Sequence, residues 1–258
     1  MAIAKVNLFS ESLGMCVNCW VILPQRKDHA PGKKVPVLWL LHGHSGNAFD
    51  WVRKSNIDRY ANAAGIAVVM PSAFNSAYTD MVHGLKYFSF IADELPVKLR
   101  KMFNFSDKRE DNFIAGLSMG GAGSIKIGLS RPEQYAAIGC LSAGAINRGA
   151  ASIINRRHLI LFGDTPLDRT KNDPYFLAEN ILKEGRPCPR IFHCCGSEDF
   201  LLASAHETRD FFGNLPDNPF QYEYLEAPGA HTWKFWDEHI QDFIRFLNLP
   251  KPDAEYIG

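Results

Sequence analysis

The residues Gly116-Leu117-Ser118-Met119-Gly120-Gly121 form the pattern Gly-x-Ser-x-Gly. The pattern alone is weak evidence, because a chain of this composition has roughly 0.09 chance matches to it. Its surroundings make it specific: an apolar, strand-like run over 112–115 leads into it, and a helix-like run of small residues follows. A serine at such a turn adopts a strained backbone that lifts its hydroxyl above the sheet. The sequence therefore predicts a nucleophile elbow at Ser118.

A phosphate-binding loop is the alternative for these glycines. It would require a lysine after the glycines and a different glycine spacing, so the nucleophile elbow is the favoured interpretation.

A serine hydroxyl is a poor nucleophile until a base takes its proton and an acid orients that base. The acid is expected in the loop after the predicted strand Arg190–Cys195, and Asp199 lies there. Glu198 and Asp164 are rival acids. Asp199 also has a purely structural alternative, that of a helix N-cap.

His231 is the candidate base, because it alone among nine histidines follows the last predicted strand and precedes the last predicted helix. Four others lie inside predicted elements and are expected to be structural: His206 and His239 in helices, His158 and His193 in strands. His83 lies in a loop, where binding and simple solvent exposure are both open.

Acyl transfer passes through an oxyanion that needs two backbone N–H donors already in place. Met119, directly after the nucleophile, is one expected donor. The other is expected from the glycine-containing loop 41–47, at His44. The alternative is an ordinary glycine-rich turn.

Four aromatic residues are candidates for the wall of an acyl site, although such residues more often belong to the core. They are Trp51, Phe74, Tyr78 and Trp233.

Alternating strand-length and helix-length segments must position these residues, and they predict an α/β fold with a mainly parallel central sheet and helices on both faces. The expected strands are Val35–Leu41, Ile66–Met70, Asn112–Leu117, Ala136–Leu141, Arg190–Cys195 and Phe220–Glu226, with antiparallel edge strands near Ala4–Glu11 and Met15–Leu23. The expected helices are Asn56–Ala64, Phe88–Met102, Gly120–Gly128, Ala203–Phe212 and Lys234–Leu247.

We expect a single domain over residues 1–258, interrupted by an insertion over 143–189 that is longer than one crossover requires. The insertion is interpreted as a lid or pocket wall before the acid-bearing strand. The alternative is an extra helix pair packed on the sheet edge. Exposed apolar positions within it would equally suit a homodimer interface.

Composition excludes several function classes. With 28 Lys+Arg and 28 Asp+Glu the formal net charge is zero, which argues against a nucleic-acid partner. No apolar run approaches the ~20 residues that span a bilayer, and no signal-peptide pattern opens the chain, so we expect no membrane association and a cytoplasmic location. Cys16-x-x-Cys19 is interpreted as part of a strand rather than as a redox or metal site, and no metal is expected.

Motifs along the chain resemble those of the bacterial tributyrin esterases, in the esterase D-like group of α/β hydrolases. They are Leu40-Leu41-His42-Gly43, Tyr78-Thr79-Asp80, Asp93-Glu94-Leu95-Pro96, Phe113 to Gly121, and His231-Thr232-Trp233 followed by Trp236. The resemblance extends from about residue 5 to 248. It implies an α/β-hydrolase fold and a cofactor-free serine carboxylesterase that uses Ser118, Asp199 and His231 on a small-molecule ester with a short acyl group.

Other functions stay open within and beyond this group. One is a feruloyl or acetyl esterase acting on plant-derived oligosaccharide esters, and another is a thioesterase similar to S-formylglutathione hydrolases. A third is a catalytically inactive hydrolase that serves as a binding module. His44 departs from the family pattern, in which a small or apolar residue is more usual, so the acyl preference is not fixed by the motifs.

Overall fold

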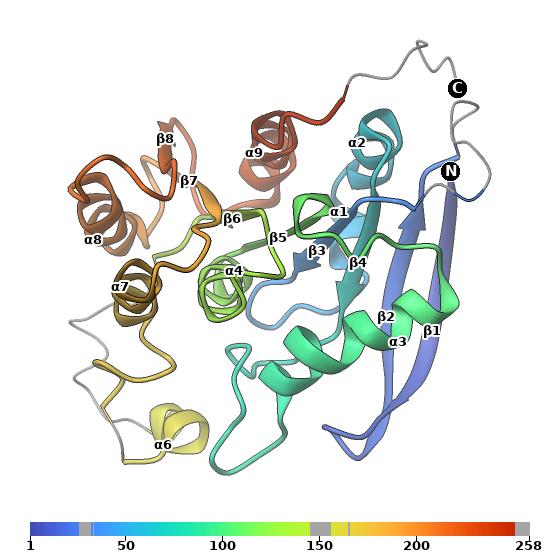
Figure 1. Cartoon of the computed structure of the whole chain (residues 1–258), viewed down its shortest axis with the longest axis horizontal. Coiled ribbons are helices and arrows are strands. Elements are labelled where there is room, and N and C mark those ends of the chain that lie inside the picture. Colours follow the sequence, from blue (N-terminus) through green and yellow to red (C-terminus); the bar gives the residue numbers. More distant parts are fainter. Residues whose placement is uncertain (26–31, 33, 145–155, 165, 251–258) are drawn as a thin grey trace.

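The computed structural model describes residues 1–25, 32, 34–144, 156–164 and 166–250, and these share one eight-stranded sheet in the order β1-β2-β4-β3-β5-β6-β7-β8 (Figure 1). β1 and β2 pair with each other and β2 with β4 in antiparallel fashion, and all other pairs are parallel. The strands are β1 (Ala2–Ser10), β2 (Met15–Leu23), β3 (Val37–Leu41), β4 (Ala67–Pro71), β5 (Asn112–Leu117), β6 (Ala137–Leu141), β7 (Arg190–Gly196) and β8 (Glu223–Ala227).

Helices cover both faces of this sheet, as predicted (Figure 1). One face carries α1 (Asp50–Lys54), α2 (Ile57–Ala64) and α9 (Trp233–Phe246). The other carries α3 (Leu95–Met102), α4 (Met119–Ser130), α7 (Pro174–Glu184) and α8 (Leu202–Gly213). A π-helical segment, Ser89–Glu94, leads into α3, and a 3₁₀ turn, Arg109–Asp111, leads into β5.

The central strands are buried on both sides, which explains why their sequences show no polar alternation. In β3, Val37, Trp39 and Leu41 belong to one core cluster and Leu38 and Leu40 to the other. Successive side chains of a strand point to opposite faces, so a single apolar run supplies both cores.

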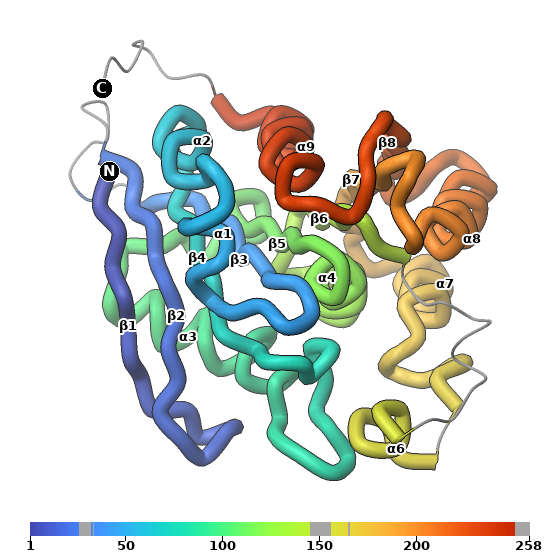
Figure 2. Tube along the Cα trace, turned by 180° about the vertical axis from the view of Figure 1, so that it is seen from behind, coloured from blue at the N-terminus to red at the C-terminus, as the bar shows by residue number. Residues whose placement is uncertain are grey.

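The predicted insertion divides into two parts. α7 packs against α4, and its Tyr175 ring lies 4.5 Å from that of Phe211 on α8, so α7 belongs to the helix layer. α6 (Arg156–Phe162) lies apart from the sheet, beside the loop around Val82 (Figure 2). Residues 145–155 and 165 of the insertion lie outside the described residues, and its movement as a lid stays a prediction.

Two expectations about elements were wrong. His158 lies in α6 and not in a strand. The stretch Phe88–Met102, expected as one α-helix, begins as the π-helical segment, and the regular α3 starts only one residue before Pro96. Pro96 lacks the N–H that a continuous i→i−4 ladder would need, and it lies directly after the point where the π-helical segment gives way to α3.

Candidate active site

Ser118 stands at the turn between β5 and α4 with φ 53° and ψ −121°, a strained backbone conformation for a residue other than glycine. The flanking glycines allow this turn to form. A Cβ on Gly116 would lie 2.4 Å from the Gly120 carbonyl oxygen, and one on Gly120 would lie 2.6 Å from that of Leu41. The structure therefore contains the sharp turn that the sequence predicts around Ser118.

Ser118, His231 and Asp199 form one continuous hydrogen-bonded chain. His231 Nε2 lies 3.0 Å from Ser118 Oγ, and His231 Nδ1 lies 2.8 Å and 3.0 Å from the two carboxylate oxygens of Asp199. Because a carboxylate only accepts, Nδ1 carries the proton and Nε2 is left to accept from the serine hydroxyl. This is the protonation state that a serine nucleophile requires of its base.

Asp199 is suited to hold a histidine in this state. Burial would raise the pKa of its carboxyl, but hydrogen bonds from His231 and from the Leu201 N–H hold the pKa below its usual range. The rival acids Glu198 and Asp164 are exposed. Asp199 is not the N-cap of α8, which begins at Leu202 with Leu201 as its N-cap.

Two aromatic rings lie against the ring of His231. The buried Trp236 meets the His231 ring edge to face at 4.9 Å, and the Phe200 ring lies 4.5 Å from it. Phe200 was not among the predicted site residues. Its only signal in the sequence is its position directly after the candidate acid.

The loop after β3 lies directly against the nucleophile. A Cβ on Gly43 would lie 3.5 Å from the Cβ of Ser118. The Gly43 carbonyl oxygen accepts hydrogen bonds from the Gly46 N–H at 3.1 Å and from Nδ1 of His42 at 2.7 Å. In a planar trans peptide the next N–H, that of His44, points opposite to this carbonyl.

His42 in turn is held from both ends. Its Nε2 accepts from the Ala73 N–H at 3.0 Å, so Nδ1 carries the ring proton and donates to Gly43. Burial lowers the pKa of His42, which favours this neutral form. The Tyr78 hydroxyl donates to the His42 carbonyl oxygen at 2.7 Å.

Met119 has the other expected donor, and it is the first residue of α4. Amides in the first turn of a helix have no intrahelical acceptor, so the Met119 N–H is available to a ligand.

The four predicted wall residues fall into two groups. Trp51 and Tyr78 are fully buried and bonded to backbone carbonyls, Trp51 to Leu41 at 3.1 Å, so they support the site from the core and do not line it. Phe74 is 60% exposed, and Trp233 is half-buried with its ring edge to face with Trp51 at 5.2 Å. Only these last two present surface to a ligand.

α6 lies near the loop that follows β3, because the charge of its Arg157 acts on His44. The His44 side chain is exposed, and its Nδ1 lies 3.0 Å from Ser45 Oγ. Partial burial and then the positive charge of Arg157 on α6 lower the pKa of His44. The pocket-wall role of the insertion stays a prediction, carried by α6.

The remaining predicted structural histidines have the partners that such a role requires. His193 is buried, with Nδ1 2.7 Å from the Tyr222 hydroxyl and Nε2 2.7 Å from the Ala143 carbonyl oxygen, and burial lowers its pKa to about 4. His206 pairs with Glu226 and His239 with Asp242.

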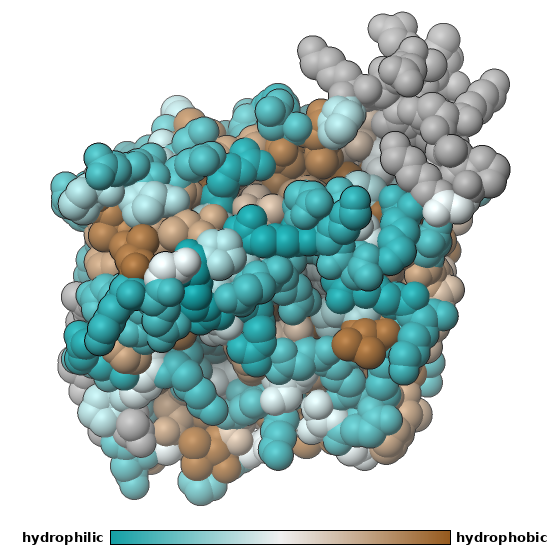
Figure 3. All heavy atoms as spheres, viewed as in Figure 1, coloured by the Kyte–Doolittle hydropathy of each residue, from teal (hydrophilic) through white to brown (hydrophobic). Residues whose placement is uncertain are grey.

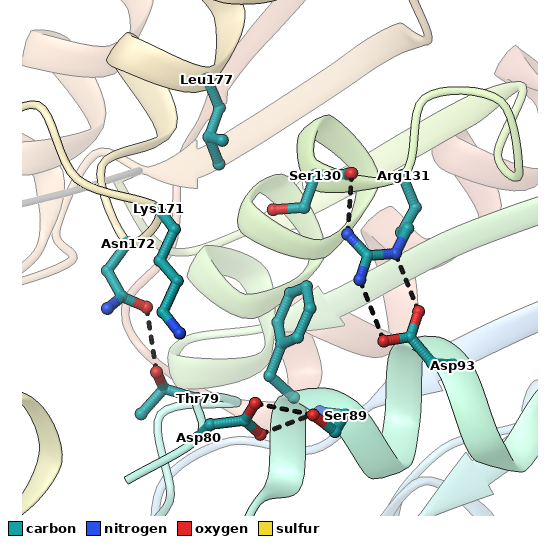
Figure 4. Close-up of a pocket in the computed structure, with 10 residues that line it drawn as sticks. Thr79, Asp80, Ser89, Asp93, Ser130, Arg131, Lys171, Asn172 and Leu177 are labelled. Atoms are coloured by element: carbon teal, nitrogen blue, oxygen red, sulfur yellow. Dashed lines mark hydrogen bonds and ion pairs between the residues drawn. The ribbon is translucent and has the colours of Figure 1, made fainter. Parts of the chain in front are cut away.

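A polar cavity of about 280 Å³ lies at the opposite end of α4 from Ser118 (Figure 4). Its charged walls are largely paired internally, since Asp93 holds Arg131 through two hydrogen bonds and Asp80 accepts from Ser89. Lys171 also lines it. Its wall at the C-terminal end of α4, formed by Ser130 and Arg131, lies about 18 Å along the helix from Ser118.

Two further observations concern the part of the chain that the structure describes. There, no three or more His, Cys, Asp or Glu side chains gather as metal ligands would, and no helix is long and apolar enough to cross a bilayer. Cys16 is exposed and Cys19 buried on β2, as expected for residues facing opposite sides of a strand, and all six cysteines are free.

Comparison with known proteins identifies the family. A family model described as "Putative esterase" matches residues 10–247. The chain belongs to this esterase family. An acetyl esterase of Caldicellulosiruptor saccharolyticus is 31% identical to it over an alignment covering 96% of this chain and 98% of that protein.

Solved structures agree with this assignment. A fluorophosphonate-binding serine hydrolase of Staphylococcus aureus matches the esterase with a TM-score of 0.87 and 32% identity, covering 95% of this chain and 98% of that one. An S-formylglutathione hydrolase of the same species matches with a TM-score of 0.84 and 31% identity, covering 96% and 99%. The esterase therefore has the α/β-hydrolase fold and is a serine hydrolase of carboxylic esters.

Proposed function

We propose that the esterase hydrolyses short-acyl carboxylic esters through an acyl-enzyme on Ser118. The observation that carries the proposal is the unbroken chain of hydrogen bonds from Asp199 through His231 to Ser118 Oγ. In the reaction, Ser118 Oγ attacks the ester carbonyl carbon while His231 Nε2 takes the hydroxyl proton. Asp199 stabilises the imidazolium that forms.

Collapse of the tetrahedral intermediate then breaks the bond to the leaving oxygen. His231 Nε2 gives its proton to that oxygen, and the alcohol departs. Water attacks the acyl-enzyme with His231 again as base, which releases the carboxylic acid and restores Ser118. In both halves of the reaction the His44 and Met119 N–H groups bind the oxyanion.

Side chains, backbone and water supply every step in this proposal, so it requires no metal and no cofactor. The substrate is a small-molecule ester. A homodimer and a cytoplasmic location also stay predictions, which size-exclusion chromatography and cell fractionation test.

The acyl-group preference is tested by kcat/KM across esters of increasing acyl length. We expect a maximum between acetyl and butyryl, in line with the similarity to an acetyl esterase. An S-acyl glutathione belongs in the same series, because the similarity to an S-formylglutathione hydrolase favours thioester hydrolysis as the second candidate. Methyl ferulate is included as the test of a feruloyl esterase.

Ser118→Ala is the blank for these assays. Loss of the nucleophile is expected to lower kcat by on the order of 10⁴-fold or more. A variant that keeps near-full activity, or wild-type protein that a fluorophosphonate fails to label, would contradict the assignment of Ser118.

A further inference from the structure

Phe200 is the most exposed of the large hydrophobic residues in the described part of the chain, at 76%. Single exposed apolar residues are common on proteins and need no special explanation. This one differs because its ring lies 4.5 Å from the ring of His231, the base of the site. An apolar ring that stays in water beside a reacting group is available to a ligand.

The backbone holds Phe200 firmly in this place. Asp199 N–H donates to the Gly196 carbonyl oxygen at 3.0 Å, and Asp199 Oδ1 accepts from the Leu201 N–H at 2.8 Å. Both residues that flank Phe200 are thus tied to the turn that presents the catalytic acid. With the backbone held, only the two side-chain torsions of Phe200 are left to be ordered by a ligand, which keeps the entropy cost of the contact small.

The chemistry of the reaction decides which part of a substrate lies near this ring. His231 Nε2 must reach the leaving oxygen to protonate it, so the alcohol portion of the ester departs on the His231 side of the site. The oxyanion donors lie elsewhere, on the Gly43 loop and at the start of α4. Phe200 is therefore placed to contact the alcohol and not the carbonyl oxygen.

Resting on the function proposed above, we infer that Phe200 is a specificity-determining residue that selects esters whose alcohol portion has a flat apolar ring near the ester oxygen. Such a ring can pack on the exposed side of Phe200 in offset or edge-to-face geometry. A flexible or strongly polar alcohol would gain little from the same contact.

Benzyl acetate and ethyl acetate test this inference, because they share one acyl group, both release primary alcohols and differ mainly by a phenyl ring. We expect Phe200→Ala to lower kcat/KM for benzyl acetate about fivefold more than for ethyl acetate. Phe200→Leu, which keeps apolar bulk without a planar face, should behave as Phe200→Ala does. Phe200→Tyr should restore the wild-type ratio of kcat/KM for benzyl acetate to kcat/KM for ethyl acetate.

Deacylation and pH dependence separate this role from a merely structural one. Both esters form the same acetyl-enzyme. An effect of Phe200 on binding of the alcohol portion must therefore appear in the acylation step and leave the deacylation rate constant unchanged. If Phe200 only positioned the His231 ring, its replacement would shift the pH profile of kcat/KM and lower kcat/KM for both esters equally. That result would overturn the inference. An unchanged ratio in Phe200→Ala would overturn it as well.

Two controls complete the experiment. Phe9→Ala removes another exposed phenylalanine, 53% exposed on the edge strand β1, and should leave the ratio unchanged. Ser118→Ala distinguishes a failure of the proposed function from a failure of the role proposed for Phe200. Full activity in that variant contradicts the proposed function, whereas loss of activity there with an unchanged ratio in Phe200→Ala contradicts only the role of Phe200.

Discussion

His42 touches no reacting atom, yet it holds the peptide whose N–H, that of His44, is proposed above as an oxyanion donor. Its ring links the Ala73 N–H on one side to the Gly43 carbonyl oxygen on the other. Since the His44 N–H belongs to the same peptide plane as that carbonyl, we assign His42 as a positioning residue.

Two amides that imitate opposite ends of the ring test this role. His42→Asn can still donate to Gly43 from the position of Nδ1, whereas His42→Gln keeps only an acceptor near that of Nε2. Removing an oxyanion donor lowers kcat about 10²–10³-fold. A misoriented His44 N–H in His42→Gln should therefore lower kcat about tenfold or more, with KM little changed. His42→Asn should keep more of the activity.

Steady-state kinetics and thermal unfolding together check this prediction. Equal kcat values for two equally stable variants would show that the link to Gly43 does not matter for catalysis.

At the scale of elements, Asp173 is the N-cap of α7, and replacing it measures how much this helix start contributes to the free energy of unfolding. Its buried carboxylate accepts from the N–H groups of Tyr175 at 3.0 Å and Phe176 at 3.3 Å, and from that of Arg169 at 2.9 Å. Losing an N-cap costs about 0.5–2 kcal/mol. We expect Asp173→Ala to lower the unfolding free energy by at least the upper end of that range, because the three amides lose a common acceptor.

Chemical denaturation gives the required free energies. Asp173→Asn serves as the matched control, because asparagine is also a good N-cap, and it should recover most of the loss. If alanine and asparagine destabilise the protein equally, the capping explanation is wrong.

The sequence predicts a secondary-structure element well where burial sets its pattern of apolar residues, and poorly where burial does not. β5 is found over the residues expected, because a strand covered on both faces is a plain apolar run. The apolar residues around His158 are equally continuous but form α6, whose Leu159 and Ile160 are exposed. A short apolar run does not distinguish a strand from a helix, and only the tertiary setting decides.

The same contrast holds for the site. Ser118, Asp199 and His231 were found by their order and by the turns that hold them, and the structure brings them within hydrogen-bonding distance. Trp51 and Tyr78 were placed in the acyl wall because they lie close to the loops in sequence, and the structure buries both. Motifs specify backbone turns, whereas the direction of a large side chain depends on packing between distant segments.

For the molecule as a whole, the buried Lys126 of α4 couples stability to pH. Burial lowers its pKa to about 7; the charge of Asp80 raises it and that of Lys171 lowers it further. Between pH 7 and the ordinary lysine range the unfolded chain binds one proton that the folded chain has released. Stability from this group therefore rises with pH across that interval.

Lys126→Met tests this contribution, because the variant lacks the buried amine while nearly all other groups titrate alike in both proteins. We expect the unfolding free energy of wild type to rise relative to that of the variant from pH 7 to pH 10. Parallel curves would show that Lys126 keeps its ordinary pKa. The variant also loses the bond from Lys126 Nζ to the Ala77 carbonyl oxygen, which is a constant offset and not a slope.

The face of the molecule drawn in space-filling form is mixed in hydropathy (Figure 3). On the face shown in Figure 3, hydrophobic residues form small separate groups among hydrophilic ones. The absence of a nucleic-acid partner stays a prediction, which rests on the formal net charge of zero.

The spacing of the triad along the chain also bears on how the protein is made. His231 lies 113 residues beyond Ser118, and its partner Asp199 lies 32 residues before it. A ribosome that has released β5 and α4 has already delivered the nucleophile, but that serine meets its base only after β7, β8 and the loop into α9 have emerged and docked. We therefore expect the nascent esterase to be inactive until the chain as far as His231 has emerged and docked, so that hydrolysis reports the assembly of this half of the sheet.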